Sequence, residues 1–347
     1  MGFMSWSSFS NLFWELIIVN KLFSQSLDQF LLYLLHRKRS QQFHFNCESV
    51  EPLSVQSSNV DAFYPLPRVP DILFEQQSKK RKYKIGKYLY ESQIESNDLE
   101  NKISCGLYYE PESSDQNVHV IFVHGWRMDS LDTVNNLFLD RFLDEGYHLY
   151  FFTLPYHFER EPVASRYSGE WMVSANIDRT LLSVRQAISD LRALIHWLKQ
   201  HRGGKIVLIG VSLGGFLTNL VGALEKHIDM LISVFYANSL AYSVWNTIPG
   251  KYIKKDLVHH KFTYEQLQAH WAMTDPSRFQ PIIPLENILL LSGMYDQYVL
   301  EEDTHRLWES WGRPRRILYP CGHAGLALNK KQIALDVIQF LQPRLRG

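Results

Sequence analysis

IVLIGVSLGGFLTNL, at residues 206–220, contains a serine framed by glycines in the order Gly210-Val211-Ser212-Leu213-Gly214. The apolar run 206–209 before the serine is typical of a strand buried on both faces, and the residues after it favour a helix. A strand that turns directly into a helix has no space for bulky side chains two positions before and after the serine. Since Gly210 and Gly214 meet that demand, we predict a tight, strained turn that holds the Ser212 hydroxyl above the edge of a sheet.

The rest of the chain alternates between strand and helix patterns. The clearest helix spans about 179–201, where apolar residues repeat at three- and four-residue steps. Strands are predicted over 82–92, 103–111, 118–123, 147–155, 205–210, 228–238, 287–293 and 315–320, and further helices over about 129–145, 213–227, 301–310 and 325–341. Because strands that alternate with helices form a parallel sheet covered on both faces, the predicted fold class is α/β with a mostly parallel central sheet.

The bulk composition is that of an ordinary globular protein. The 347 residues include 36 Lys and Arg against 36 Asp and Glu, so the formal net charge is zero, and no nucleic-acid partner is expected. The three cysteines, Cys47, Cys105 and Cys321, are far apart and odd in number. Their arrangement argues against a disulfide framework or a zinc site and favours a reducing compartment, so we expect a cytoplasmic protein.

Residues 9–39 are rich in large apolar side chains, but polar residues interrupt them. No run approaches the ~18 to 20 apolar residues that span a bilayer, and the pattern predicts one or two amphipathic helices. Neither a signal peptide nor a myristoylation start fits the first residues. Two interpretations stay open: the helices pack on the domain, or they rest on a membrane surface with the help of the basic cluster at residues 36–39.

A serine hydroxyl is a weak nucleophile that needs a general base and an acid to orient that base. His323 lies in the predicted loop between the last strand and the last helix, and Asp296 follows the strand 287–293. The chain order Ser, Asp, His matches one fold that carries such a triad. Asp275 is a competitor for the acid, although its Asp-Pro sequence is typical of a turn. We predict Ser212 as nucleophile, His323 as base and Asp296 as acid.

The tetrahedral intermediate of such a reaction requires N–H donors that face its oxyanion. The sequence His124-Gly125-Trp126 follows the strand 118–123, and Gly125 allows the backbone to turn inward. We predict that the backbone N–H groups of Trp126 and Leu213 form this oxyanion hole. His124 is either a packing residue at the strand end or a part of the pocket.

Together with the alternating elements, these motifs resemble the α/β-hydrolase superfamily, in particular an esterase- and lipase-like branch. The resemblance covers about residues 83–341 and implies an α/β-hydrolase fold with an eight-stranded sheet and the triad at strand ends. We divide the chain into an N-terminal amphipathic extension and linker, residues 1–60, and a hydrolase domain, residues 61–347, with a lid-like insertion at about 239–286. Trp126 departs from the glycine-rich oxyanion loop of one lipase and esterase group.

The expected activity is hydrolysis of a carboxylic ester, of a small molecule or a lipid, through an acyl-enzyme and without a metal or an organic cofactor. The loop after Pro155 and the insertion 239–286 lie where they could roof the site. Candidates for the substrate pocket are therefore His124, Tyr156, His157, Trp171 and Trp245. A peptidase or an acyltransferase with the same triad remains an alternative, as does a binding protein of this fold without turnover. The sequence leaves the acyl length and the oligomeric state open.

Overall fold

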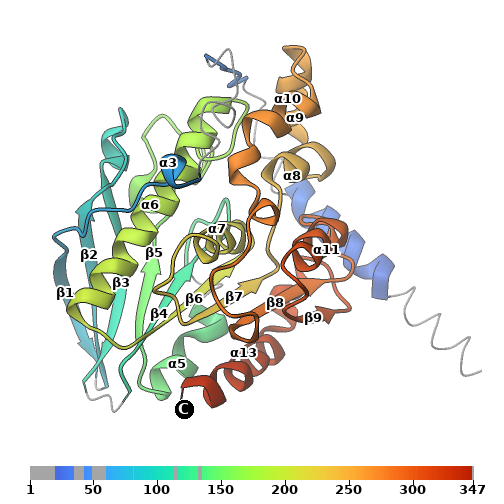
Figure 1. Cartoon of the computed structure of the whole chain (residues 1–347). Coiled ribbons are helices and arrows are strands. Elements are labelled where there is room, and N and C mark those ends of the chain that lie inside the picture. Colours follow the sequence, from blue (N-terminus) through green and yellow to red (C-terminus); the bar gives the residue numbers. More distant parts are fainter. Residues whose placement is uncertain are drawn as a thin grey trace, which may run out of the picture.

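A single sheet of nine strands runs through the described part of the chain, with helices on both sides (Figure 1). The structure is a computed structural model. The residues that it describes are 20–34, 43–48, 60–80, 82–112, 116–131 and 135–345.

The strand order in the sheet is β1-β2-β3-β5-β4-β6-β7-β8-β9. Strands β4 to β9 run parallel to one another. Three antiparallel pairs extend the sheet, β1 with β2, β2 with β3 and β3 with β5. The predicted mostly parallel sheet is thereby confirmed. The strand bounds are β1 Leu73–Lys80, β2 Tyr83–Glu91, β3 Ile103–Pro111, β4 Val118–Val123, β5 His148–Phe152, β6 Lys205–Val211, β7 Met230–Val234, β8 Ile288–Gly293 and β9 Arg315–Tyr319.

The resemblance implied eight strands, and β1 is the additional one. Its sequence, LFEQQSKK, is almost entirely polar after the first two residues, and most of its side chains are exposed. A strand at the edge of a sheet pairs on one side only, and polar or charged side chains there protect the free side from pairing with other molecules. Such a strand lacks the alternation of apolar residues on which the prediction relied.

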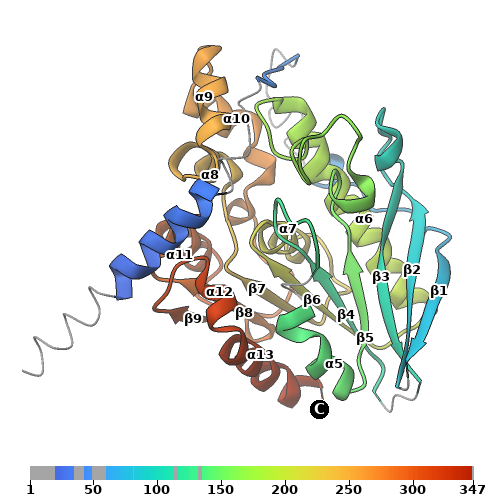
Figure 2. The same cartoon turned by 180° about the vertical axis from the view of Figure 1, so that it is seen from behind.

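Alternate residues of the central strands face two separate cores. Ile121 and Leu208 belong to the core under α6 (Ile177–His201) and α7 (Leu213–Gly222), whereas Phe122 and Ile209 face the core under α5 (Asp140–Asp144) and α13 (Lys330–Leu345). Figures 1 and 2 show these two helix pairs on opposite sides of the sheet. The prediction of helices on both faces is therefore confirmed.

The remaining helices lie at the edges and beyond the strand ends. The insertion between β7 and β8 contains α8, α9 and α10, which are grouped above the sheet in Figure 1. The predicted helix 129–145 is a π-helical turn, η2, followed by α5, and the predicted last helix is divided into α12 and α13. The bounds are α3 Val60–Phe63, η2 Asn135–Leu139, α8 Leu240–Asn246, α9 Lys251–His259, α10 Tyr264–His270, α11 Glu301–Ser310 and α12 Gly325–Leu328.

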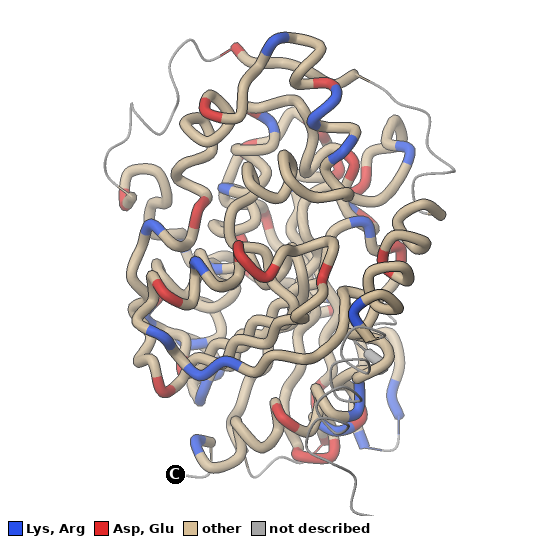
Figure 3. Tube along the Cα trace, turned by 90° about the vertical axis from the view of Figure 1, so that its right-hand side faces the viewer, with Lys and Arg blue, Asp and Glu red and all other residues tan. Residues whose placement is uncertain are grey.

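A further helix covers residues 20–34 and lies beside α8 and α11 (Figure 2). In the described part of the chain, no helix combines the length and the apolar character that crossing a bilayer demands. Acidic and basic residues are interspersed over the face that Figure 3 turns to the viewer.

Candidate active site

Ser212 occupies the turn between β6 and α7, with backbone angles of φ 56° and ψ −116°. This conformation is strained for any residue that carries a side chain, and such strain is characteristic of functional turns. The surroundings leave no space at the flanking glycines. A Cβ at Gly210 would lie 2.4 Å from the Gly214 carbonyl oxygen, and a Cβ at Gly214 would lie 2.1 Å from that of Val123. The glycines therefore allow β6, α7 and β4 to approach closely enough to form the turn.

The imidazole of His323 is held by the carboxylate of Asp296. The His323 Nδ1 and Asp296 Oδ2 atoms are 2.7 Å apart, and the other carboxylate oxygen accepts the backbone N–H groups of Tyr298 and Val299, each at 2.8 Å. Because a carboxylate can only accept, Nδ1 must carry the proton and Nε2 is left as the basic nitrogen. Asp296 follows β8 and His323 follows β9, so both lie at the carboxyl ends of parallel strands, as Ser212 does.

Asp275, the competing acid, lies elsewhere. Its carboxylate accepts hydrogen bonds from the backbone N–H and the hydroxyl of Ser277, at 3.1 Å and 2.5 Å. These contacts close the turn that begins the 3-10 helix Pro276–Arg278. The structure therefore brings Asp296, and not Asp275, to His323.

Aromatic side chains enclose the His323 ring. Tyr298 stacks on it with ring centroids 4.6 Å apart and planes 12° apart, and Phe235 presents its edge at 6.0 Å. Burial by itself lowers the pKa of His323, but the charge and the hydrogen bond of Asp296, with a smaller contribution from Asp28, outweigh it. The net pKa of His323 lies above its ordinary value, which favours a ring that takes up a proton during a reaction.

The loop after β4 approaches Ser212 from the other side. A Cβ at Gly125 would lie 3.3 Å from the Ser212 Cβ, so the backbone of the next residue, Trp126, is close to the serine. The Trp126 indole N–H donates to the Gly169 carbonyl at 2.7 Å, and the Arg127 guanidinium lies 4.0 Å from the centre of its ring. These contacts fix the loop. Leu213 is the first residue of α7, where backbone N–H groups have no partner within the helix.

A pocket of about 250 Å³ opens beside Ser212 and His323. The loop after β4 and the start of α7 form one wall of it. The opposite wall comes from α8 and the residues that follow it, which belong to the segment between β7 and β8. Most of the lining is apolar and includes Val173, Leu240, Val244, Pro249, Val299 and Leu326.

Comparison with known proteins decides the family. The model of the alpha/beta hydrolase family matches residues 120–329, which is more than half of the chain. The chain belongs to the alpha/beta hydrolase family. Among sequence relatives, the uncharacterized protein YdjC of Bacillus subtilis is 48% identical over 115 residues, which are 33% of this chain and 99% of that protein. An uncharacterized protein of Mycobacterium tuberculosis is 31% identical over 142 residues, which are 40% of this chain but only 33% of that protein.

Solved structures share the fold at low identity. An acetyl xylan esterase from Paenibacillus sp. R4 is similar with a TM-score of 0.62 and 15% identity, over 85% of this chain and 96% of that one. Acetyl xylan esterase 1 from Thermoanaerobacterium sp. JW/SL YS485 has a TM-score of 0.59 and 15% identity, over 83% and 94% of the two chains. Acylaminoacyl peptidase from Pyrococcus horikoshii has a TM-score of 0.53 and 14% identity, over 76% of this chain and 42% of that one.

In this alpha/beta hydrolase, the five residues predicted for the substrate pocket do not line it. His124 and His157 are buried behind the wall. The His124 Nδ1–H donates to the Gly125 carbonyl at 2.8 Å and its Nε2 accepts the Leu154 N–H at 3.1 Å, while burial lowers its pKa to about 4. His157 donates to the Pro155 carbonyl at 2.8 Å, and burial lowers its pKa well below the ordinary value. Both are neutral packing residues.

The other three candidates contact groups outside the pocket lining. The Tyr156 hydroxyl donates to Asp98 at 2.8 Å. Cations lie over the rings of the two tryptophans, with Arg179 4.7 Å from the centre of the Trp171 ring and Lys254 5.1 Å from that of Trp245. The sequence did not identify which residues of these segments line the pocket, because aromatic side chains pack in a protein core as readily as they contact a substrate. Tyr298, two residues after Asp296, was missed, although its position beside the acid was a usable signal.

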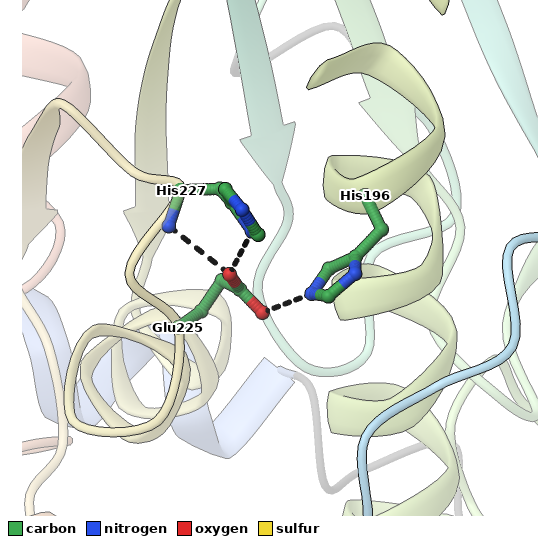
Figure 4. A group of neighbouring side chains, drawn as sticks. All are labelled: His196, Glu225 and His227. Carbon is green, nitrogen blue, oxygen red and sulfur yellow. Dashed lines mark hydrogen bonds and ion pairs between the residues drawn. The ribbon is translucent and has the colours of Figure 1, made fainter. Parts of the chain in front are cut away.

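A cluster with the residue types of a metal site joins α6 to the segment between α7 and β7 (Figure 4). The Glu225 carboxylate accepts from His196 Nε2 and His227 Nδ1, each at 2.7 Å, and from Arg192 Nε at 3.3 Å. Burial raises the pKa of Glu225, but these partners outweigh it and lower the value to about 2. Two imidazoles and a carboxylate suit zinc, yet Arg192 shares an oxygen with His196, and a metal ion would have to displace it. The arrangement is a hydrogen-bonded ion cluster.

Proposed function

We propose that the protein is a serine hydrolase that cleaves a carboxylic ester with a short, apolar acyl group. The observation that carries this proposal is the pair His323–Asp296, joined at 2.7 Å, in the wall of the same pocket as the strained Ser212 turn. The family supports hydrolysis in general, and the esterases of the same fold support an ester as the substrate.

Each group of the site has a role in the proposed reaction. Ser212 Oγ attacks the ester carbonyl while His323 Nε2 takes the hydroxyl proton, and Asp296 stabilises the imidazolium that forms. The N–H groups of Trp126 and Leu213 stabilise the oxyanion. When the tetrahedral intermediate collapses, His323 protonates the leaving alcohol and an acyl-serine remains. Water, deprotonated by His323, then attacks the acyl carbon. The bond from the acyl carbon to Ser212 Oγ breaks as His323 returns the proton to Oγ, which releases the acid and free Ser212.

The size and lining of the pocket define the acyl group. An apolar cavity of about 150 Å³ accommodates a benzene molecule, so a pocket of about 250 Å³ suits an acyl group of a few carbons up to one somewhat larger than a ring. Among the described residues that line the pocket, Arg127 is the one with a permanently charged side chain. This favours an uncharged acyl group over an aminoacyl group with its free ammonium.

The proposal is tested with p-nitrophenyl esters of increasing acyl length, aminoacyl substrates and a fluorophosphonate probe. We expect the wild type to prefer short esters and to be labelled, and Ser212→Ala to lose both properties. Ser243→Ala is the matched control, because Ser243 also lines the pocket but lies on α8, and it should be labelled like the wild type. Equal labelling of wild type and Ser212→Ala, or absence of hydrolysis across the whole series, would overturn the proposal. Faster cleavage of aminoacyl substrates would favour the peptidase.

We also infer that the outer face of the helix at residues 20–34 contacts an anionic lipid surface. Leu22, Phe23, Phe30 and Tyr33 are 59%, 61%, 56% and 62% exposed, and the basic cluster at residues 36–39 follows in the sequence. Apolar and basic residues side by side are the combination that binds such surfaces. Phe23→Ser with Phe30→Ser should reduce sedimentation with phosphatidylserine vesicles, whereas Leu66→Ser, which alters a side chain 77% exposed, should not. Unchanged sedimentation of the double variant would contradict the inference.

A further inference from the structure

A carboxylate from the N-terminal helix reaches both loops of the acid–base pair. Asp28 is fully buried. Its Oδ2 accepts the backbone N–H groups of Gln297 at 3.0 Å and His323 at 2.8 Å, and its Oδ1 accepts that of Ala324 at 2.9 Å. Gln297 is the neighbour of Asp296 in the loop after β8, and the other two bonds go to the loop after β9. One side chain therefore joins the loop of the acid to the loop of the base.

The helix packs on the domain along a narrow stripe with Asp28 at its centre. Ser24, Asp28 and Leu32 follow one another at four-residue steps and are the buried residues of the helix, while most of its other side chains are exposed. A buried carboxylate costs free energy unless it is hydrogen-bonded. The three N–H donors compensate this cost where the helix lies, so the carboxylate favours this docking position.

The histidine loop is shaped to receive this carboxylate. A Cβ at Gly322 would lie 2.4 Å from Asp28 Oδ2 and 2.7 Å from its Cγ. Any larger residue at this position would push the carboxylate away from the N–H of His323. The glycine beside the proposed base thus serves the contact with Asp28.

We propose that Asp28 is a positioning residue, which sets the placement of His323 relative to Asp296 and Ser212 when the N-terminal helix is docked. The proposal rests on the proposed function. Asp28 does not line the pocket, so it acts through the backbone of the two loops. Among the described residues, the titratable groups that face His323 are Asp296 and Tyr298 from the loop after β8 and Asp28 from the helix.

Kinetics of Asp28→Ala and Asp28→Asn test the proposal. Displacement of a catalytic group by about 1 Å can cost about 100-fold in rate, so we expect Asp28→Ala to lower kcat for a short p-nitrophenyl ester about 10- to 100-fold with little change in KM. Asp28→Asn should lose less, because an amide oxygen in the place of Oδ2 still accepts from Gln297 and His323, and only the bond from Ala324 is lost. Ser24→Ala is the matched control from the same buried stripe and should leave kcat unchanged.

An NMR titration of the His323 ring gives a readout without substrate. Replacing Asp28 by Asn removes a negative charge beside the ring, so the pKa of His323 should fall, and the acid limb of kcat/KM should move to lower pH with it. If Asp28→Ala and Asp28→Asn lower only the melting temperature and leave kcat and the His323 titration unchanged, Asp28 is structural and the proposal is wrong. If the wild type hydrolyses no ester, the proposed function fails, and the NMR titration alone then decides the role of Asp28.

Discussion

Replacing Asp296 by Asn tests whether the role of Asp296 is to keep the proton of the neutral His323 ring on Nδ1. In the wild type one carboxylate oxygen accepts from Tyr298 and Val299, and the other accepts from His323 Nδ1. An Asn side chain has a single acceptor oxygen, and the two backbone N–H groups hold it. Its amide NH₂ therefore faces Nδ1, which must become the acceptor. The ring proton moves to Nε2, and this nitrogen can no longer take the proton of Ser212.

The expected loss follows from that tautomer. Where an enzyme with such a triad loses the correct tautomer but keeps its geometry, kcat falls about 10⁴-fold, which corresponds to about 5.5 kcal/mol of barrier. We expect a loss of this order in kcat for a short p-nitrophenyl ester, with KM nearly unchanged. Labelling by a fluorophosphonate should slow in parallel, because the same proton transfer activates Ser212. The melting temperature should change little, since the side-chain shape is kept.

The control is Asp275→Asn, which changes the residue that the sequence offered as an alternative to Asp296 for the acid of the triad. Asp275 contacts Ser277 and not His323, so this variant should keep wild-type kcat. If Asp296→Asn keeps more than about a tenth of the wild-type kcat, the tautomer does not limit the reaction. If Asp275→Asn shows the larger loss, the acid has been wrongly identified.

Two further predictions concern the pocket and the distant cluster. Val244 is buried in the pocket wall, so Val244→Phe should lower kcat/KM for butyrate and longer esters at least about tenfold more than for the acetate; equal losses would contradict this pocket. The pKa of Glu225 falls from 4.5 to about 2 on folding, so its ionisation stabilises the fold above pH 4.5 and this stability is lost as the pH falls toward 2. Glu225→Gln should lower the free energy of unfolding by roughly 3 kcal/mol at pH 7 in urea melts, with a difference that shrinks toward pH 3; a constant difference would refute the assignment.

Local sequence predicts those parts of the site whose position is determined by steric demands or by the strand that precedes them. The turn at Ser212 needs glycines two positions away on each side, and the sequence displays them directly. Asp296 and His323 lie in the loops that follow the predicted strands 287–293 and 315–320, and the carboxyl ends of parallel strands meet at one edge of the sheet. Their proximity therefore follows from the alternation of strands and helices alone.

The pocket wall could not be predicted in the same way. The insertion between β7 and β8 was located from its weak periodicity, but which of its side chains face Ser212 depends on how α8 is oriented. Val244 faces the pocket and its neighbour Trp245 does not. Adjacent helical residues point about 100° apart. An error of one position in the predicted helix start therefore assigns surface residues to the pocket and pocket residues to the surface. The prediction selected large aromatic residues, whereas smaller aliphatic residues form most of the pocket wall.

The N-terminal helix departs from the rule that an amphipathic helix turns its apolar face inward. Its buried stripe contains Ser24 and Asp28, and Phe23 and Phe30 are exposed. The partners of Asp28 lie at least 269 residues away in the chain, so no local pattern could identify them. The sequence left open whether these residues pack on the domain or rest on a membrane. In the described part of the chain the two are compatible, because Asp28 is bound by the loops of Asp296 and His323 while Phe23 and Phe30 are exposed. If Asp28 positions His323 as proposed, a partner that binds the exposed face of this helix also acts on the placement of His323.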